Sequence, residues 1–287
     1  MKQIVFISGK GGTGKSTVVA SLSLLVKNKI MADCDVDAPN LHLLLEGERL
    51  QKEDYYGAEE AVIDPELCVS CGLCRETCRF DAISEDNKII PMKCEGCGAC
   101  VLVCPQNAIS LEEVKTGETY VDNTQRGKFS HALLGIGAEG SGKLVTEVKE
   151  NLYAFADGEE WAIVDGSPGI GCSVIASITG ADAVVVVCEP TKSGRGDLER
   201  VLGVSRHFGI PAFVCINKYD LNSEITREIE EFCEDNDFPV IGRIPFEPAI
   251  VKALQQLKTP VEAGIQSVTK EVENIWRSLI TQMGMPK

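Results

Sequence analysis

Short apolar runs rich in β-branched residues recur along the chain, and stretches with helical periodicity separate them. Runs of this kind, bounded by Gly, Pro or Asp, are typical of buried strands in a parallel sheet. The alternation of strand and amphipathic helix predicts an α/β fold with a Rossmann-like, mostly parallel, doubly wound sheet. The predicted strands are residues 3–8 (QIVFIS), 161–166 (WAIVDG), 182–189 (DAVVVVCE), 212–217 (AFVCIN) and 240–245 (VIGRIP).

The middle of the chain departs from this alternation. Residues 68–104 hold eight of the 13 cysteines. Residues 112–135 then alternate polar and apolar positions with turn signals, which predicts antiparallel strands that return the chain to the larger domain. We therefore predict a main domain formed by residues 1–60 and 111–287, with a small α+β module inserted at residues 61–110.

The cysteine-rich segment contains an internal repeat. CVSCGLCRETCRFDAIS from Cys68 is followed by CEGCGACVLVCPQNAIS from Cys94, in register at an offset of 26 residues. Each unit has the spacing CxxCxxCxxxC, which in two-cluster bacterial ferredoxins gives three thiolates to one 4Fe-4S cluster and a fourth to the other. The predicted ligand sets are Cys68, Cys71, Cys74 and Cys104 for one cluster, and Cys78, Cys94, Cys97 and Cys100 for the second.

Zinc and disulfides are the alternatives for so many cysteines. Zinc sites use ligands in pairs rather than in two runs of four, and disulfides do not suit a cytosolic compartment. One position departs from the ferredoxin pattern, because Pro105 follows Cys104 whereas Arg79 follows Cys78. A proline there shapes the turn without binding iron, so we expect altered surroundings and an intact cluster.

A phosphate-binding loop follows the first predicted strand. Residues 9–16, GKGGTGKS, fit the pattern GxxxxGK[ST] and lead into a helical stretch. In such a loop the backbone N–H groups and the helix N-terminus surround the phosphates, Lys15 contacts the outer phosphates and the Ser16 hydroxyl serves Mg²⁺. The predicted nucleotide ligands in the loop are Gly11, Gly12, Thr13, Gly14, Lys15, Ser16 and Thr17.

Two acidic stretches supply the carboxylates that phosphoryl transfer needs to hold a metal ion and to orient a water molecule. ADCDVDAPN carries Asp33, Asp35 and Asp37, and IVDGSPG carries Asp165 at the end of an apolar run. A solvated turn is the alternative for an acidic stretch. It is a weak alternative for Asp165, because that residue ends a predicted strand.

These motifs together resemble one family. KGGTGKST with its additional lysine, DCDVDAPNL, VDGSPGIGC and INKYDLN resemble the MinD/ParA-type ATPases with a deviant Walker A motif. That group includes the nitrogenase iron protein and the Mrp-type iron-sulfur cluster carriers. The cysteine repeat narrows the resemblance to members that carry a 4Fe-4S ferredoxin domain, and nearly the whole chain is covered.

The resemblance implies roles for individual residues. Lys15 would bind the nucleotide of its own subunit, and Lys10 would reach the phosphates held by the partner in a homodimer closed by ATP. Asp35 would orient the attacking water. The residues implied for Mg²⁺ are Ser16, Asp35 and Asp165, with Asp165 in the outer shell of the ion. Asn217 would contact the adenine ring.

One motif also fits a different nucleotide. NKYD, residues 217–220, matches the NKxD pattern with which GTPases bind guanine through the aspartate. Asp220 is otherwise expected to cap the turn into LNSEI. The second lysine of the phosphate loop favours ATP.

Five cysteines lie outside the repeat. Cys188 and Cys215 lie in apolar, β-branched runs and are predicted core positions. Cys34 lies in the acidic loop and Cys233 on the apolar side of a charged helical stretch, and neither has a partner at ligand spacing. Cys172 follows Asp165 by the interval at which a cysteine of the nitrogenase iron protein ligates a cluster shared between subunits. The companion cysteine is missing from LLGIGAEGSGKLV, so a small, buried, structural Cys172 is the favoured alternative.

Charge and hydropathy limit the partners. With 43 Asp and Glu against 28 Lys and Arg, the net charge of −15 repels nucleic acid and anionic lipid. The longest apolar stretches fall short of a membrane-spanning helix, and no secretory signal pattern precedes the first motif. We therefore expect a cytoplasmic protein with no nucleic-acid partner and no membrane partner.

Two functions of different classes follow. In the first, an ATPase uses nucleotide-driven dimer closure to deliver electrons, or to load a metal or iron-sulfur cluster, onto an unidentified acceptor protein. In the second, the protein is a non-redox positioning switch of the MinD/ParA type whose clusters only stabilise the fold. Such switches need a membrane or DNA surface, so the acidic charge favours the first. The sequence does not separate electron transfer from cluster assembly.

Overall fold

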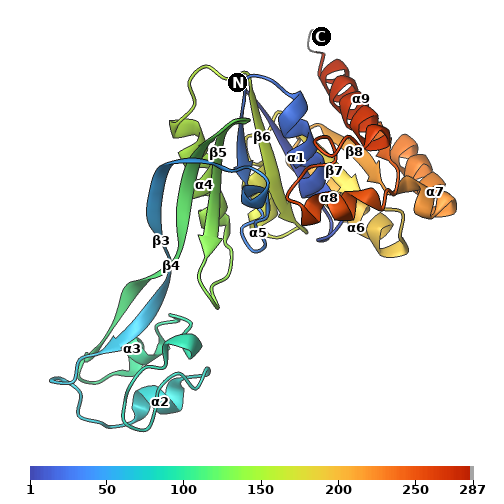
Figure 1. Cartoon of the computed structure of the whole chain (residues 1–287). Helices are drawn as coiled ribbons and strands as arrows, with labels where there is room; N and C mark the ends of the chain where they lie inside the picture. The colour runs from blue at the N-terminus through green and yellow to red at the C-terminus, as the bar shows by residue number, and fades with distance from the viewer. Residues whose placement is uncertain (285–287) are drawn as a thin grey trace. The chain divides into compact units, whose positions relative to one another are not determined.

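A mostly parallel sheet forms the frame of the protein. The computed structural model describes residues 1–284, and within them nine strands form one sheet in the order β3-β4-β5-β2-β6-β1-β7-β8-β9 (Figure 1). The pairs from β5 to β9 in this order are all parallel. The expected α/β fold with a mostly parallel sheet is therefore confirmed.

The five predicted strands are all present, and so are the antiparallel strands expected in residues 112–135, whereas two further strands, β2 and β3, were not predicted. The predicted ones are β1 (Lys2–Ser8), β6 (Trp161–Pro168), β7 (Ala183–Cys188), β8 (Ala212–Asn217) and β9 (Val240–Ile244). The others are β2 (Lys29–Asp33), β3 (Gly47–Ile63), β4 (Ile109–Thr124) and β5 (Gly127–Leu134). Because β4 and β5 are neighbours joined by a two-residue turn, they run antiparallel, as the alternation in residues 112–135 predicts.

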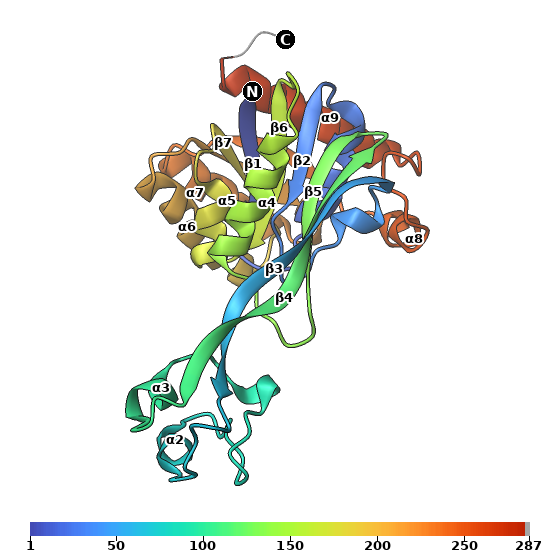
Figure 2. The same ribbon diagram turned by 90° about the vertical axis from the view of Figure 1, so that its left-hand side faces the viewer.

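Helices cover both faces of the sheet (Figure 2). On one face, α1 (Lys15–Leu25) and α9 (Gln266–Gln282) pack against apolar side chains of the central strands, such as Phe6 and Ile163, with α8 (Ala249–Gln255) beside them. The opposite face carries α4 (Gly142–Ala154), α5 (Cys172–Ile178), α6 (Lys192–His207) and α7 (Ser223–Asp235). No helix in residues 1–284 combines the length and hydrophobicity needed to cross a bilayer.

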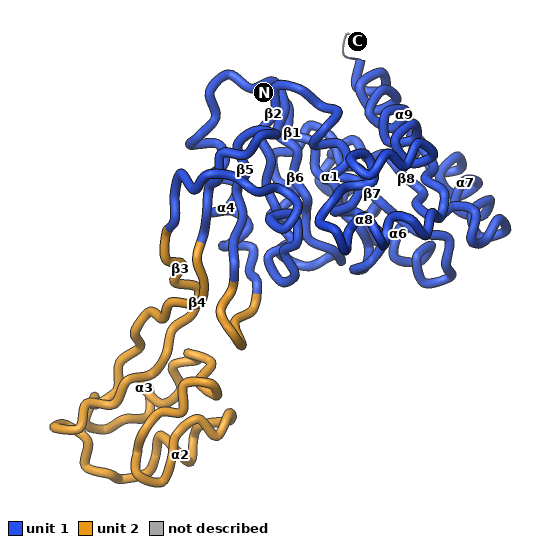
Figure 3. Tube along the Cα trace, viewed as in Figure 1, with its two compact units in different colours: residues 1–52, 119–133, 140–287 blue, residues 53–118, 134–139 orange. Residues whose placement is uncertain are grey.

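The chain divides into two compact units (Figure 3). Unit 1 comprises residues 1–52, 119–133 and 140–287, and unit 2 comprises residues 53–118 and 134–139. The segment 61–110, which the sequence predicts as an inserted module, lies within unit 2, whose bounds are wider. Strands β3 and β4 each contribute residues to both units.

Unit 2 repeats one local structure. Helices α2 (Leu73–Thr77) and α3 (Ala99–Val103) occupy equivalent positions of the two cysteine repeats. Each follows a glycine in the left-handed region, Gly72 with φ 79° and Gly98 with φ 74°, a conformation that costs glycine little. Around them a small core gathers five buried residues: Ala61, Cys74, Ile83, Cys100 and Ile109.

Short 3-10 helices complete the assignment. They are η1 (Leu41–Leu43), η2 (Pro91–Lys93) and η3 (Tyr219–Leu221). The last of these lies in the predicted NKYD motif. In that region the expectation for Asp220 as a cap is wrong, because the side chain of Asn222 caps α7 by accepting from the backbone N–H groups of Glu224 and Ile225 at 3.2 and 3.1 Å.

Candidate nucleotide site and cysteine cavities

The phosphate-binding loop connects β1 to α1 at the carboxyl edge of the parallel strands, where ligands bind in open α/β sheets. Gly14 lies just before α1 with φ 90°. A Cβ atom there would also lie 2.3 Å from Asn217 Nδ2, so only glycine fits. The amide of Asn217 donates to the Thr13 carbonyl at 2.7 Å, which fastens the loop to the end of β8.

Lys15 lies at the start of α1 with only 5% of its side chain exposed. Its Nζ is 2.7 Å from Asp165 Oδ1 and 3.4 Å from Asp35 Oδ2. Burial alone would lower the pKa of Lys15, but the nearby Asp165 and Asp35 carboxylates outweigh it and raise the pKa above its ordinary value. Lys15 is therefore a fixed positive charge, held by the two carboxylates that the sequence predicts for the same site.

Asp33 organises the acidic loop, a role that sequence analysis did not assign. This fully buried carboxylate accepts hydrogen bonds from the backbone N–H groups of Asp35, Asn40 and Leu41, each at 3.1 Å. Burial and the neighbouring Asp165 charge raise the pKa of Asp33 to about 7. The feature that could have indicated this role is the position of Asp33 at the end of β2. There it pairs in register with Asp165 on the neighbouring strand β6.

The site has unused buried oxygens that fit a bound metal ion and phosphates. Asp165 is 0% exposed, and its Oδ2 accepts no hydrogen bond from any residue between 1 and 284. The Thr13 hydroxyl is buried and unpartnered in the same part of the chain. Because buried polar atoms are normally hydrogen-bonded, these two are suited to a metal-bound water and to a phosphate.

Lys10 lies in different surroundings from Lys15. Its Nζ is 2.9 Å from Glu189 Oε1 and within 3.3 Å of the Thr191 and Ser193 hydroxyl oxygens. The second oxygen of Glu189 is 3.1 Å from Lys218 Nζ. The sequence identifies Lys10 but gives no sign that Glu189 holds it.

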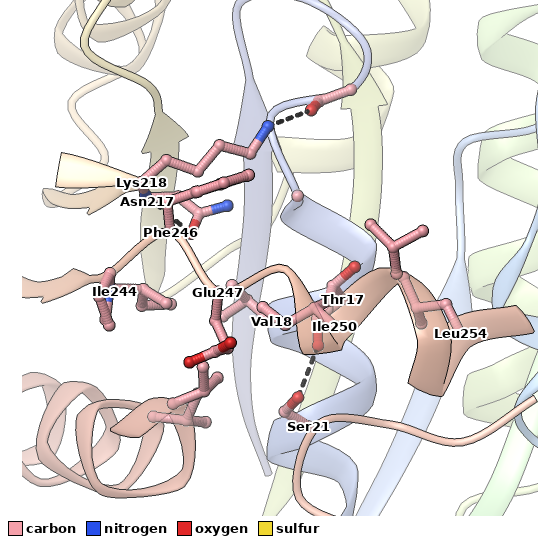
Figure 4. Close-up of a pocket in the computed structure, with 16 residues that line it drawn as sticks. Thr17, Val18, Ser21, Asn217, Lys218, Ile244, Phe246, Glu247, Ile250 and Leu254 are labelled. Atoms are coloured by element: carbon pink, nitrogen blue, oxygen red, sulfur yellow. Dashed lines mark hydrogen bonds between the residues drawn. The ribbon is translucent and has the colours of Figure 1, made fainter. Parts of the chain in front are cut away.

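A pocket opens beside the phosphate loop (Figure 4). It encloses about 730 Å³, including space open to solvent, between α1, the end of β8, the segment after β9, and α8. Its polar lining includes Thr17, Asn217 and Lys218, and its apolar lining includes Ile250 and Leu254. An apolar slot with a few polar groups next to a phosphate loop suits a nucleoside.

Asp220 is not among the residues that line this pocket. Its Oδ1 accepts a hydrogen bond from the Phe246 N–H at 2.7 Å. Guanine recognition by an NKxD motif requires the aspartate to accept from the base, and here one oxygen already serves the backbone.

The eight cysteines of the repeat line two separate cavities in unit 2. Each cavity encloses about 360 Å³, including space open to solvent. The first is lined by Cys68, Cys71, Cys74 and Cys104. The second is lined by Cys78, Cys94, Cys97 and Cys100. The grouping is the one that the repeat spacing predicts for two clusters.

The cavities do not resemble sites for a single metal ion. In residues 1–284 no three His, Cys, Asp or Glu side chains converge to hold one ion. In a 4Fe-4S cluster each thiolate binds a different iron atom, so the sulfurs surround a cube rather than meet at a point.

Backbone N–H groups already point at sulfur atoms around the cavities. The Ala82 N–H donates to Cys78 Sγ at 3.4 Å, and the Ala108 N–H donates to Cys104 Sγ at 3.3 Å. These two contacts occupy equivalent positions in the repeats. Such contacts stabilise a thiolate and tune the potential of a cluster.

The remaining cysteines divide into buried and exposed. Cys34, Cys188, Cys215 and Cys233 are buried, which confirms the predicted core positions of Cys188 and Cys215. Cys172 is exposed at the start of α5, so the expectation of a buried, structural Cys172 is wrong. Gly171 is the N-cap residue of α5 and follows the end of β6, the strand that carries Asp165.

Known proteins similar to this chain share its nucleotide-binding domain. Residues 4–261 match the family CobQ/CobB/MinD/ParA nucleotide binding domain. The uncharacterized protein MJ0578 of Methanocaldococcus jannaschii is 36% identical over 226 residues, which cover 77% of this chain and 79% of the relative. The uncharacterized ATP-binding protein MJ0547 of the same organism is 25% identical, covering 87% of this chain and 76% of the relative.

Solved structures share the fold. The septum site-determining protein MinD complexed with Mg-ADP, from Pyrococcus horikoshii, is 16% identical with a TM-score of 0.60, covering 99% of this chain and 97% of that one. MinD in the MinC:MinD cell division complex of Aquifex aeolicus gives a TM-score of 0.58 at 18% identity, with 100% and 98% covered. At these identities the likeness shows an α/β P-loop NTPase fold.

Proposed function

Because the chain belongs to the CobQ/CobB/MinD/ParA family of P-loop ATPases, we propose that it couples ATP-driven closure of a homodimer to two 4Fe-4S clusters held by unit 2. The coupled output is electron transfer, or assembly of a metal or iron-sulfur cluster, on an acceptor protein. The observation that carries the iron-sulfur part is the sorting of eight cysteines into two cavities, each lined by one predicted ligand set. The nucleotide part follows from the family and from the geometry around Lys15.

In the nucleotide step Lys15 exchanges carboxylates for phosphates. Its ammonium lies 2.7 Å from Asp165 and 3.4 Å from Asp35. When the triphosphate enters the loop, Lys15 turns to the outer phosphates and frees both carboxylates. Asp35 then orients the attacking water, and Ser16 with Asp165 would hold Mg²⁺ directly or through water. The metal ion, when bound, neutralises charge on the phosphates.

Lys10 provides the second cation in this proposal. A cation that arrives from a partner subunit stabilises the negative charge of the transition state only when two copies have closed. Lys10 is suited to this because it is one third exposed and its ammonium is held by side-chain contacts outside the phosphate loop. Hydrolysis is thereby linked to dimerisation.

Adenine is the base that the pocket favours. One oxygen of Asp220 is used by the Phe246 N–H, and Asp220 does not line the pocket. The relative MJ0547 is described as ATP-binding. We therefore propose ATP rather than GTP, with Asn217 at the base.

Bound clusters supply one-electron redox chemistry. Cys71 and Cys97 are the exposed thiols of the two cavities, whereas Cys74 and Cys100 are buried. The exposed thiols mark the sides from which an acceptor protein would approach. Redox proteins of this kind form small, transient interfaces.

A second candidate is a positioning switch of the MinD/ParA type in which the clusters stabilise unit 2. The comparisons favour this candidate, because the solved structures with this fold include cell division proteins, a ParA family ATPase and a plasmid partition protein. Such a switch needs no change in cluster potential when ATP binds. The two candidates share the ATPase and differ in what the clusters do.

Iron analysis tests the cysteine assignment. Protein prepared without oxygen is expected to contain about eight iron atoms and eight acid-labile sulfides per chain. Cys71→Ser and Cys97→Ser should each reduce the iron bound, because each removes a ligand from one cavity. Cys172→Ser is the matched control, since Cys172 is exposed but lines neither cavity, and its iron content should equal that of the unaltered protein. Stoichiometric zinc would contradict the proposal.

A further inference from the structure

Glu189 contacts two lysines from different parts of the nucleotide site. It directly follows β7, and its side chain is 17% exposed. Oε1 lies 2.9 Å from Nζ of Lys10 in the phosphate loop, and Oε2 lies 3.1 Å from Nζ of Lys218 in the NKYD motif. Both carboxylate oxygens are therefore engaged. The two ion pairs lower the pKa of Glu189 against the opposing effect of burial, so it stays ionised at neutral pH.

The position in which Glu189 holds Lys10 is otherwise unfavourable for a cation. Lys10 Nζ donates to the hydroxyl oxygens of Thr191 and Ser193 at 3.3 and 3.2 Å. Thr191 is the N-cap residue of the 16-residue helix α6, and its hydroxyl also accepts from the Gly194 N–H. The first turn of a helix carries partial positive charge and repels a cation. The Glu189 carboxylate is the negative group that outweighs this repulsion.

Lys218 links the ion pair between Glu189 and Lys10 to the binding of nucleotide. Its backbone is in the left-handed region with φ 54°, uncommon for a residue other than glycine. Its side chain lines the nucleotide pocket, with Nζ 3.4 Å from the Gly12 carbonyl oxygen. Phosphates bound at the loop attract Lys218, and phosphates held by a second copy attract Lys10, so nucleotide and carboxylate compete for the same two cations.

We propose that Glu189 is a positioning residue that keeps Lys10 on its own chain until nucleotide is bound and a second copy closes. The proposal rests on the role of Lys10 across the dimer interface put forward above. An ion pair present in the open chain and absent from the closed dimer shifts the equilibrium toward the open chain by its own free energy. Glu189 thereby sets how readily Lys10 becomes available to the partner.

The first test measures directly, in the nucleotide-free protein, how far Glu189 restrains the Lys10 side chain. Glu189→Gln keeps the side-chain shape and removes the charge. The rate at which an amine-reactive reagent labels Lys10, followed by peptide mass spectrometry, should rise about fivefold, the upper range for a partly exposed ion pair. Exposed Lys270 serves as the internal reference and should be labelled at an unchanged rate. An unchanged Lys10 rate overturns the proposal.

The second test measures dimerisation by sedimentation with a non-hydrolysable ATP analogue. Because closure releases Lys10 in both copies, Glu189→Gln should dimerise at about 25-fold lower protein concentration, with an unchanged kcat once protein is saturating. Glu199→Gln is the matched control, because exposed Glu199 lies on α6 and pairs only with Arg195 among the ion pairs of residues 1–284.

The two readouts separate the proposals. Faster labelling of Lys10 with unchanged dimerisation would contradict the role of Lys10 across the interface and leave the ion pair as a purely local contact. Unchanged labelling with altered dimerisation would show that Glu189 acts by another route, which overturns the holding role while the ATPase mechanism stands.

Discussion

Lys10 and Lys15 are five residues apart in one loop, and their counter-ions differ. Lys15 is buried between Asp165 and Asp35, whereas Lys10 is one third exposed and bound to Glu189. A buried ammonium with two carboxylates is suited to receive phosphates from its own loop. A partly exposed ammonium paired with a single carboxylate is suited to leave. The residue environments thus agree with the two roles that the sequence assigns to these lysines.

Alanine substitutions distinguish the two lysines. Lys15→Ala should abolish tight nucleotide binding, because it removes the only buried cation that faces Asp165 and Asp35 in the described part of the chain. Lys10→Ala should bind ATP normally but lose most ATPase activity and ATP-dependent dimerisation. Calorimetry and turnover assays measure the two effects, and Lys270→Ala on the exposed face of α9 is the control.

Two results would contradict this assignment. If Lys10→Ala hydrolysed ATP at the normal rate, catalysis would not depend on a lysine from the partner subunit. If the unaltered protein bound GTP more tightly than ATP, Asp220 would bind the guanine base in spite of its hydrogen bond with the Phe246 N–H.

The sequence places single residues best where a motif sets both the residue and its backbone. The phosphate loop lies between β1 and α1, and each predicted set of four cysteines lines one cavity. For Cys172 no motif sets the burial, which depends on how the chain leaves Gly171, and the structure exposes it. Glu189 was missed because its partners Lys10 and Lys218 come from distant parts of the sequence.

At the scale of elements, five buried strands and the antiparallel strands of residues 112–135 were predictable from the sequence, whereas β2 and β3 were not. The runs of β1, β7 and β8 are apolar on both faces because helices cover both sides of the sheet. Strand β2 begins with Lys29 and is only five residues long, so its pattern is too brief to recognise. Strand β3 is mostly exposed along 17 residues, and its polar sequence lacks a buried face.

Stacked rings join η1 to the strands β4 and β5. The imidazole of His131 on β5 stacks on Tyr120, Phe129 and His42, with ring centroids 5.0, 5.0 and 5.4 Å away. Its Nε2 lies 3.0 Å from Asp122 Oδ2, and its buried Nδ1 meets no hydrogen-bond partner within residues 1–284. Burial lowers the pKa of His131 to about 4, although Asp122 opposes the shift.

This lowered pKa predicts how stability depends on pH. The unfolded chain, in which histidine titrates near 6.5, binds more protons than the folded one between about pH 4 and 6.5. The contribution of His131 is therefore complete above pH 6.5 and is lost as the pH falls to about 4. The full shift corresponds to about 3 kcal/mol.

His131→Phe isolates this contribution from other titrating groups such as Asp33. The difference in urea midpoint between the variant and the unaltered protein should grow in favour of the variant as the pH falls from 7 to 4.5. Tryptophan fluorescence is the readout, because Trp161 and Trp276 both lie in unit 1 with the stacked rings. His207→Phe at an exposed position is the control, and an equal pH slope for both proteins would contradict the assignment.

At the scale of the whole molecule, the central question is whether ATP and the clusters belong to one mechanism. If they do, ATP must bind with different affinity to the oxidised and reduced protein, and the effect is reciprocal. A tenfold difference in ATP affinity corresponds to a shift of about 59 mV in a one-electron potential. Redox titrations with ATP, with ADP and without nucleotide measure it.

The expected result is a displacement of roughly 60 to 130 mV by ATP, equivalent to a tenfold to hundredfold change in affinity. Lys15→Ala is the control, because ATP should leave its potential unchanged. If the cluster potentials were the same in all three nucleotide states, the result would support the positioning switch, in which the clusters only stabilise unit 2.

The interleaving of the two cysteine repeats also constrains how the protein is made. Each cavity takes three cysteines from one repeat and its fourth from the other, Cys104 for the first and Cys78 for the second. A nascent chain that has emerged from the ribosome only as far as residue 93 holds the whole first repeat but neither cavity. Both cavities become complete only after the second repeat has been synthesised. Neither cluster can therefore be inserted before that point, and the two cavities form together.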